Sequence, residues 1–292
     1  MITALLAIAC FAQDPVLAAR VSYPGTVTSD FRWWDLEVLY DEGRYPEGLT
    51  AAKQARQSNP KDADLYWLQI RFMFEIAEGV SRLDKSFDKV AWYTEMLNLA
   101  NLGLAIAPDH GHLLYARGIA AGRLGTTKGV LASLGSAKGI EADWQRVSSS
   151  GFAYSSIGGQ EVLPCDAHLT LAIFYRLVPD WWIVQVLAGT RGDLQKSADY
   201  GAKADRCSPG RILIVKELGV SQLCLGQNTK DPAMEAAGTA TLKRALTLPI
   251  VSDKTDRIDL QHVRMLLEDP SLACEYSRDG QQELDESKLP PK

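Results

Sequence analysis

The chain has 292 residues, of which 46% are hydrophobic and 23% are charged, and its formal net charge is −5. This is the composition of an ordinary globular protein, long enough to bury a substantial core within one elongated domain. Lysines and arginines are scattered among carboxylates and form no basic stretch, so nucleic acid is not expected as a ligand.

An apolar run opens the chain from Ile2 to Ala12. It is too short to span a bilayer but long enough for the apolar part of a secretory signal. The residues ending at Cys10 also resemble the lipobox of bacterial lipoproteins, whose acylated cysteine attaches the protein to a membrane. The alternative is a buried first helix. We expect residues 1–12 to be a signal peptide or lipoprotein signal and residues 13–28 to be a tether.

The predicted packed domain, residues 29–276, repeats one pattern. A small residue is followed five places later by a proline and about ten places after that by a glycine, which is typical of helix-turn-helix repeats of about 34 residues. Small residues let two helix backbones approach, and proline lacks the amide that a continuing helix needs. The residues that mark the three clearest units are Gly43, Gly48, Ala55 and Pro60, then Gly103, Pro108 and Gly118, then Ala204, Pro209 and Gly219.

A weaker fourth unit ends at Pro249, and a closing helix with its apolar residues on one face follows it. No alternating strand pattern is sustained along the chain. The sequence therefore predicts an all-α fold, a right-handed superhelix of antiparallel helix pairs, with residues 277–292 as a disordered tail.

The segment 122–159 is rich in glycine and has the look of a phosphate-binding loop. Such a loop needs a hydroxyl residue directly after its lysine, whereas Lys128 and Lys138 are each followed by glycine. The segment instead predicts two closely packed helices and a long loop, residues 148–159, that is mobile or closes over the concave face.

Asp109, His110 and His112 have the look of a metal-binding fragment, but they lie where a repeat helix begins, and residues two apart do not share a helix face. A structural role is favoured over a ligand role. Neither these histidines nor the serines near residue 149 belong to a recognisable catalytic arrangement. We expect no enzymatic activity, no cofactor and no metal.

Two adjacent tryptophans, Trp181 and Trp182, begin an apolar helix in which Gln185 is the one polar residue. Adjacent residues on a helix point about 100° apart, so both rarely bury against one neighbour. One account is that the helical stack wraps this helix on both sides; the other is an exposed apolar site for a partner or a membrane surface. On the second account Trp181, Trp182 and Val186 bind the partner at the edge of a concave groove.

Four cysteines follow Cys10, an even number that permits two disulfides in an exported chain. Cys165 begins a helix and Cys207 ends a later one, so an antiparallel pair would bring them together. Pairing Cys207 with Cys224 would span a whole helix of some 22 Å, beyond disulfide reach. Cys224 ends one helix and Cys274 follows the closing helix. We predict the pairs Cys165–Cys207 and Cys224–Cys274; the alternative is four buried free thiols.

In its repeat marks and the order of its parts the chain resembles tetratricopeptide-repeat proteins, most closely the regulator-of-microtubule-dynamics type. The resemblance rests on segments 40–55, 64–78, 97–118, 168–189 and 246–256. A weaker similarity is to the tetratricopeptide component of substrate-binding-protein-dependent transporters. The resemblance implies a scaffold and no catalytic residues.

The sequence thus favours a non-enzymatic scaffold, located in the periplasm or at the outer membrane, that binds an unknown envelope protein. One alternative is a periplasmic ligand-binding accessory of a transporter, which would need an apolar cavity for a small apolar ligand. The other is an unrecognised enzyme, which would need a cluster of titratable groups in a pocket.

Overall fold

A computed structural model describes residues 25–26, 31–80, 84–128, 130–157, 161–251 and 253–278. The predicted signal with Cys10, most of the predicted tether, and residues 279–292 lie outside the described residues. The α-helices are α1 (Trp34–Asp41), α2 (Tyr45–Ser58), α3 (Ala63–Glu78), α4 (Lys89–Ile106), α5 (Gly111–Lys128), α6 (Val130–Ser149), α7 (Cys165–Leu177), α8 (Trp182–Ala188), α9 (Leu194–Cys207), α10 (Ile212–Thr229), α11 (Pro232–Ala245) and α12 (Asp253–Glu268). A 3₁₀ helix, η2 (Pro270–Cys274), follows α12, and the strands are β1 (Gly25–Thr26), β2 (Tyr154–Ser155) and β3 (Glu161–Leu163).

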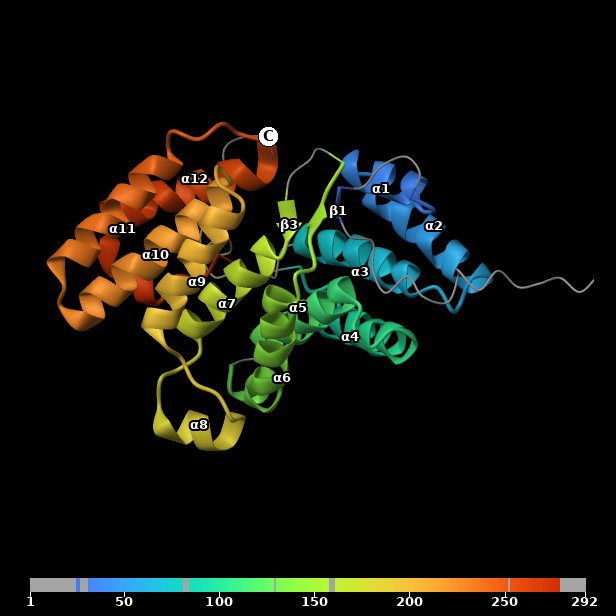
Figure 1. Ribbon diagram of the computed structural model, residues 1–292, viewed down its shortest axis with the longest axis horizontal. Helices are drawn as coiled ribbons and strands as arrows, with labels where there is room; N and C mark the ends of the chain where they lie inside the picture. The colour runs from blue at the N-terminus through green and yellow to red at the C-terminus, as the bar shows by residue number, and fades with distance from the viewer. Residues whose placement is uncertain are drawn as a thin grey trace, which may run out of the picture.

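The helices pack consecutively along the chain, as the all-α prediction requires (Figure 1). Pro60, Pro108 and Pro209 each lie in the short turn between two helices, and Gly43 ends the turn after α1 with a left-handed φ of 70°. These residues stop one helix and let the chain reverse into the next. The repeat pattern therefore located the helix boundaries in the three clearest units.

Close helix crossings account for the other glycine marks. A Cβ placed on Gly118 of α5 would lie 2.4 Å from Trp144 Nε1 on α6, and one on Gly219 of α10 would lie 2.8 Å from the Leu242 side chain on α11. Gly48 and Gly103 have equally close side-chain neighbours. Any larger residue would force these helices apart.

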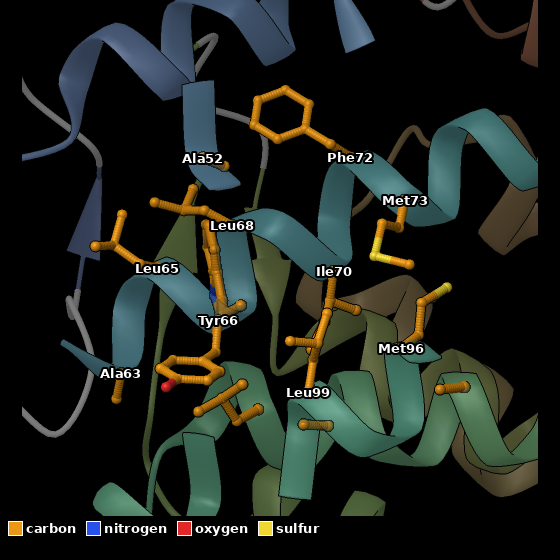
Figure 2. Close-up of a cluster of buried hydrophobic side chains, with 14 of the residues drawn as sticks. Ala52, Ala63, Leu65, Tyr66, Leu68, Ile70, Phe72, Met73, Met96 and Leu99 are labelled. Atoms are coloured by element: carbon orange, nitrogen blue, oxygen red, sulfur yellow. The ribbon is translucent and has the colours of Figure 1, made fainter. Parts of the chain in front are cut away.

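The largest apolar cluster lies in the N-terminal half and is centred on α3. Figure 2 shows Leu68 and Phe72 of α3 on the side of Ala52 of α2, with Met96 and Leu99 of α4 on the other side. A helix that is apolar on nearly all sides is buried between neighbours. Separate clusters occupy the middle of the chain and the C-terminal helices.

The three strands form a small sheet in the order β1-β2-β3. Strand β1 is parallel to β2, and β2 is antiparallel to β3. Tyr154 of β2 is buried, and its hydroxyl donates to Glu37 Oε2 at 3.0 Å. The prediction of one long loop over residues 148–159 is therefore wrong in its described part, because residues 148 and 149 end α6 and Tyr154 lies in a strand and is buried in the core. Gly25 and Thr26, which the sequence assigned to a tether, pair with β2 as strand β1 and so belong to the packed domain.

The described residues contain two disulfides, Cys165–Cys207 and Cys224–Cys274, which are the pairs that helix order predicted. The first joins the start of α7 to the end of α9, and the second joins α10 to η2. Disulfides persist in oxidising compartments, so the pair of bonds indicates an exported protein. None of the helices in the described ranges is both long enough and apolar enough to cross a membrane.

Candidate interaction site on the α8 excursion

The chain leaves the helical stack between α7 and α9 and returns after residues 178–193, a segment called here the α8 excursion. Its two ends meet at a closed base. The Asp193 amide donates to the Tyr175 carbonyl at 2.9 Å, and the Gly192 amide donates to the Pro179 carbonyl at 3.3 Å. In Figure 1, α8 lies at the lower edge of the molecule, beyond the ends of α7 and α9.

Local sequence explains why the excursion leaves and returns where it does. Val178 has extended backbone angles, as a residue before proline prefers, and this ends α7. Gly189 ends α8 in the left-handed conformation with a φ of 69°. A Cβ on Gly192 would lie 2.0 Å from the Val178 carbonyl oxygen. Glycine is therefore required where the returning segment of the excursion passes the outgoing segment.

A narrow stripe of α8 holds the excursion against the stack. Val184 and Ala188, one helical turn apart, are buried in the middle cluster with Ile140 and Trp144 of α6. Residues four apart on a helix share a face, so these two side chains form one contact line. They fix α8 on α6 and leave the rest of its surface free.

The rest of that surface is apolar and exposed. The exposed fractions are 61% for Trp181, 73% for Trp182, 46% for Ile183, 68% for Val186 and 68% for Leu187, and these five residues are called here the apolar tip. Among the residues that the structure describes, the stack does not wrap α8 on both sides, so that account of the tryptophan pair is wrong. All three residues named as partner-binding from the sequence belong to the tip, whereas Ile183 and Leu187 were not singled out.

Such exposure is unusual, because buried apolar surface stabilises a fold by roughly 25 cal/mol for each Å² removed from water. A monomer rarely leaves several large apolar side chains together in solvent unless they serve an interaction. Residues 181–190 include no ionisable side chain. The α8 excursion is therefore the candidate interaction site.

A pocket of about 220 Å³ lies at the base of the excursion, and its lining includes Glu141, Tyr175, Arg191, Asp193 and Lys196. The Tyr175 hydroxyl donates to Glu141, and Gln145 Nε2 donates to the same hydroxyl at 2.9 Å. Burial and the hydrogen bond to Glu141 raise the pKa of Tyr175 above its ordinary value. This pocket is polar, unlike the apolar tip beside it.

Ion pairs surround the base. Arg191 Nε lies 3.2 Å from Asp180 Oδ1, and Lys196 Nζ lies 3.9 Å from Asp193 Oδ2. All four side chains are at least one-third exposed. The excursion thus has charges of both signs where it joins the stack and none along its apolar tip.

The histidines that resembled a metal-binding fragment are built into the N-terminal core. His110 Nε2 lies 2.9 Å from Asp64 Oδ1, and the His112 ring meets Trp67 edge-on with ring centroids 4.1 Å apart. Burial, with help from His110 and Arg71, lowers the pKa of His112 well below its ordinary value. Within the described ranges, no three His, Cys, Asp or Glu side chains are grouped so as to hold a metal ion.

Sequence reasoning missed a buried charged cluster in the C-terminal half, made by Lys216, Glu217, Asp259, Tyr276 and Arg278. Lys216 Nζ donates to Asp259 Oδ1 at 2.7 Å and to the Tyr276 hydroxyl at 2.8 Å. Arg278 Nε donates to Asp259 Oδ1 at 2.9 Å, so the ordered contacts continue beyond residue 276. The signal in the sequence was a Lys-Glu pair within the apolar stretch 212–220, where unpaired charges would be costly.

Burial alone would lower the pKa of Lys216, but Asp259, Tyr276 and Glu217 outweigh it and raise that pKa. Burial would raise the pKa of Asp259, but Lys216 and Arg278 hold it below its ordinary value. Both groups are therefore charged in the folded protein near neutral pH. Because its charges face one another, the buried charged cluster joins α10, α12 and the C-terminal segment as a structural unit.

No protein-family model matches the chain, and no curated protein is similar to it in sequence.

Proposed function

We propose that this protein is a non-enzymatic helical scaffold of the cell envelope that engages its partner through the apolar tip. The observation that carries the proposal is the exposure of five large apolar side chains, Trp181 and four residues of α8, on an excursion whose base is closed by backbone hydrogen bonds. Their exposure costs stability that burial would supply, and partner binding gives a reason for that cost.

The periplasm or outer membrane is proposed as the location. The two disulfides support an oxidising compartment, and the apolar run at residues 2–12 supports export by a signal or lipoprotein route. Membrane attachment through acylated Cys10 belongs to the same proposal. The tetratricopeptide resemblance supports a right-handed superhelix, and it implies a protein partner for the helical stack.

A non-enzymatic role is supported by the pairing of buried titratable side chains with one another inside the fold. The buried charged cluster pairs its charges internally, and His110 is paired with Asp64. The transporter-accessory alternative needs an apolar cavity, whereas the pocket at the base of the excursion is lined by charged and polar side chains. The proposal therefore places the working surface on the α8 excursion and not in the concave groove expected from the sequence.

Photo-crosslinking in intact envelopes tests this function. A photoreactive phenylalanine analogue would replace Val186 in the apolar tip, and in a matched protein it would replace Val251, in the segment between α11 and α12. The two valines are similarly exposed, at 68% and 71%. We expect a discrete adduct, with protein or lipid, from position 186 and only background labelling from position 251. Equal labelling at both positions would show that the tip has no partner.

A further inference from the structure

We propose that the apolar tip inserts into the interfacial layer of a phospholipid bilayer, with the base of the excursion at the level of the headgroups. This inference rests on the proposed function and names the partner of its surface. It concerns residues 178–193, separately from any attachment at Cys10.

The chemistry of the tip fits lipid better than protein. The five exposed side chains amount to roughly 600 Å² of almost wholly apolar surface, whereas only about 56–58% of the interface in a non-obligate protein complex is apolar. Such complexes also form about one hydrogen bond per 100–200 Å², whereas Gln185 is the one polar side chain on the exposed surface of α8. Fluid acyl chains need neither a shaped groove nor hydrogen-bond partners.

The backbone of the excursion is prepared for an apolar environment. The Val184 amide donates to the Trp181 carbonyl at 2.9 Å, and the Gly189 amide donates to the Gln185 carbonyl at 3.0 Å. Backbone groups without a hydrogen bond are costly in a bilayer, and these bonds satisfy part of the backbone of α8.

The residue types of the apolar tip and of the base match different layers of a bilayer. The tryptophans begin the tip, and tryptophan favours the boundary between headgroups and acyl chains. The aliphatic residues Ile183, Val186 and Leu187 follow them, and residues 181–190 include no ionisable side chain. The base carries the Asp180–Arg191 and Asp193–Lys196 pairs, with charges of both signs.

This balance of charge sets an expectation about lipid type. Polybasic segments bind anionic lipid because their cations are unopposed. At this base Arg191 and Lys196 each have a carboxylate beside them, and the chain has a net charge of −5. Insertion of the apolar tip therefore contributes most of the free energy of membrane binding, and attraction to anionic lipid contributes little. Binding should depend little on headgroup charge.

Vesicle flotation tests the proposal, using the full chain with Cys10→Ser so that acylation makes no contribution. The vesicles are phosphatidylcholine alone and phosphatidylcholine with added phosphatidylglycerol. The test variant is Val186→Glu in the tip, and the matched control is Val251→Glu. We expect binding to both vesicle types, a loss of roughly tenfold or more in partition coefficient for Val186→Glu, and less than about twofold for Val251→Glu.

Acyl chains brominated near the headgroup give a second measurement. They should quench the emission of the bound protein, and the quenching should fall when Trp181 and Trp182 are replaced by phenylalanine. Absence of binding to either vesicle, or binding that requires phosphatidylglycerol and survives Val186→Glu, would overturn the proposal. A protein adduct at position 186 without vesicle binding would remove the lipid partner and leave the proposed function standing, whereas no adduct and no vesicle binding would remove both.

Discussion

The apolar tip and the buried charged cluster reverse the usual distribution of side chains in two opposite ways. In the tip, five large apolar residues are exposed; in the cluster, Lys216 and Asp259 are completely buried. The cluster is tolerated because each charge has a partner within the fold. The tip has no such partner within the described residues, so the buried charges stabilise the fold, whereas the apolar tip is the surface for which we propose an interaction.

The largest effect is expected from Asp259→Ala, which would remove one carboxylate from the buried Lys216, leaving it Glu217 Oε1 at 3.0 Å, and would remove the partner of the partly buried Arg278. Breaking a buried ion pair from one side costs roughly 3–5 kcal/mol. Urea unfolding should show that loss, and the double variant Lys216→Met with Asp259→Leu should lose less than the sum of its single changes. A loss below about 1 kcal/mol for Asp259→Ala would mean that the cluster is not a structural unit.

Removing the Cys224–Cys274 disulfide by double serine substitution should cost about 2–4 kcal/mol, because the bond closes a loop with a sequence separation of 50. It also frees η2, which leads to Tyr276 and Arg278. Hydrogen exchange should increase in α12 and around the cluster, and the α8 amides should be unaffected. Faster exchange in α8 instead would show that the two regions are coupled.

The free energy of unfolding should depend on pH through His262, by roughly 2–3 kcal/mol. Its Nδ1 lies 2.9 Å from the Tyr276 hydroxyl, and burial, together with Lys216, lowers its pKa to about 4. An unfolded histidine binds its proton near pH 6.5, so the contribution is complete above that pH and is lost as the pH falls toward 4. Urea unfolding across this window should show that the free energy of unfolding falls less steeply with decreasing pH in His262→Asn, whose oxygen accepts the same hydrogen bond. The same steepness in the variant and the original protein would exclude His262 as the source of the pH dependence.

The smallest effect on stability is expected from Trp182→Ala, within about 0.5 kcal/mol, since this side chain is 73% exposed. Partner binding should nevertheless weaken by roughly 2 kcal/mol or more, as truncation of an interface anchor does. On the same helix, the buried Val184→Ala should cost about 1–2 kcal/mol of stability. Thermal unfolding of the two variants measures the contrast, and unfolding of Trp182→Ala would place the tip in the core.

Much of the fold was accessible from local chemistry. Pro60, Pro108 and Pro209 located the helix turns, because a proline acts on its own backbone and on the residue before it. Helix order also selected the pair Cys165–Cys207, because the start and the end of antiparallel neighbours lie together. The buried position of Tyr154 was not accessible, since its partner Glu37 is 117 residues away in the chain.

The candidate site was accessible in part. The sequence located the apolar stretch around Trp181 and Trp182, but it left two accounts open, one buried and one exposed. Composition alone could not choose between them, because a run with a single polar residue suits a wrapped helix equally well. The closed base, the anchoring of Val184 and Ala188, and the absence of a second covering helix over the tip were settled by packing within the described part of the chain.

The sequence by itself determined the helical class, the turns between helices, the positions of close crossings such as Gly118 and the pairing of the cysteines, because each depends on backbone restrictions or on the order of neighbouring helices. The tertiary structure decided which side of α8 meets solvent and which charges are buried together. Lys216, Asp259 and Arg278 lie on separate segments of the chain and become a cluster only when α10, α12 and the C-terminal segment pack. Exposure and ion pairing are properties of that packing, since they depend on neighbours distant in sequence.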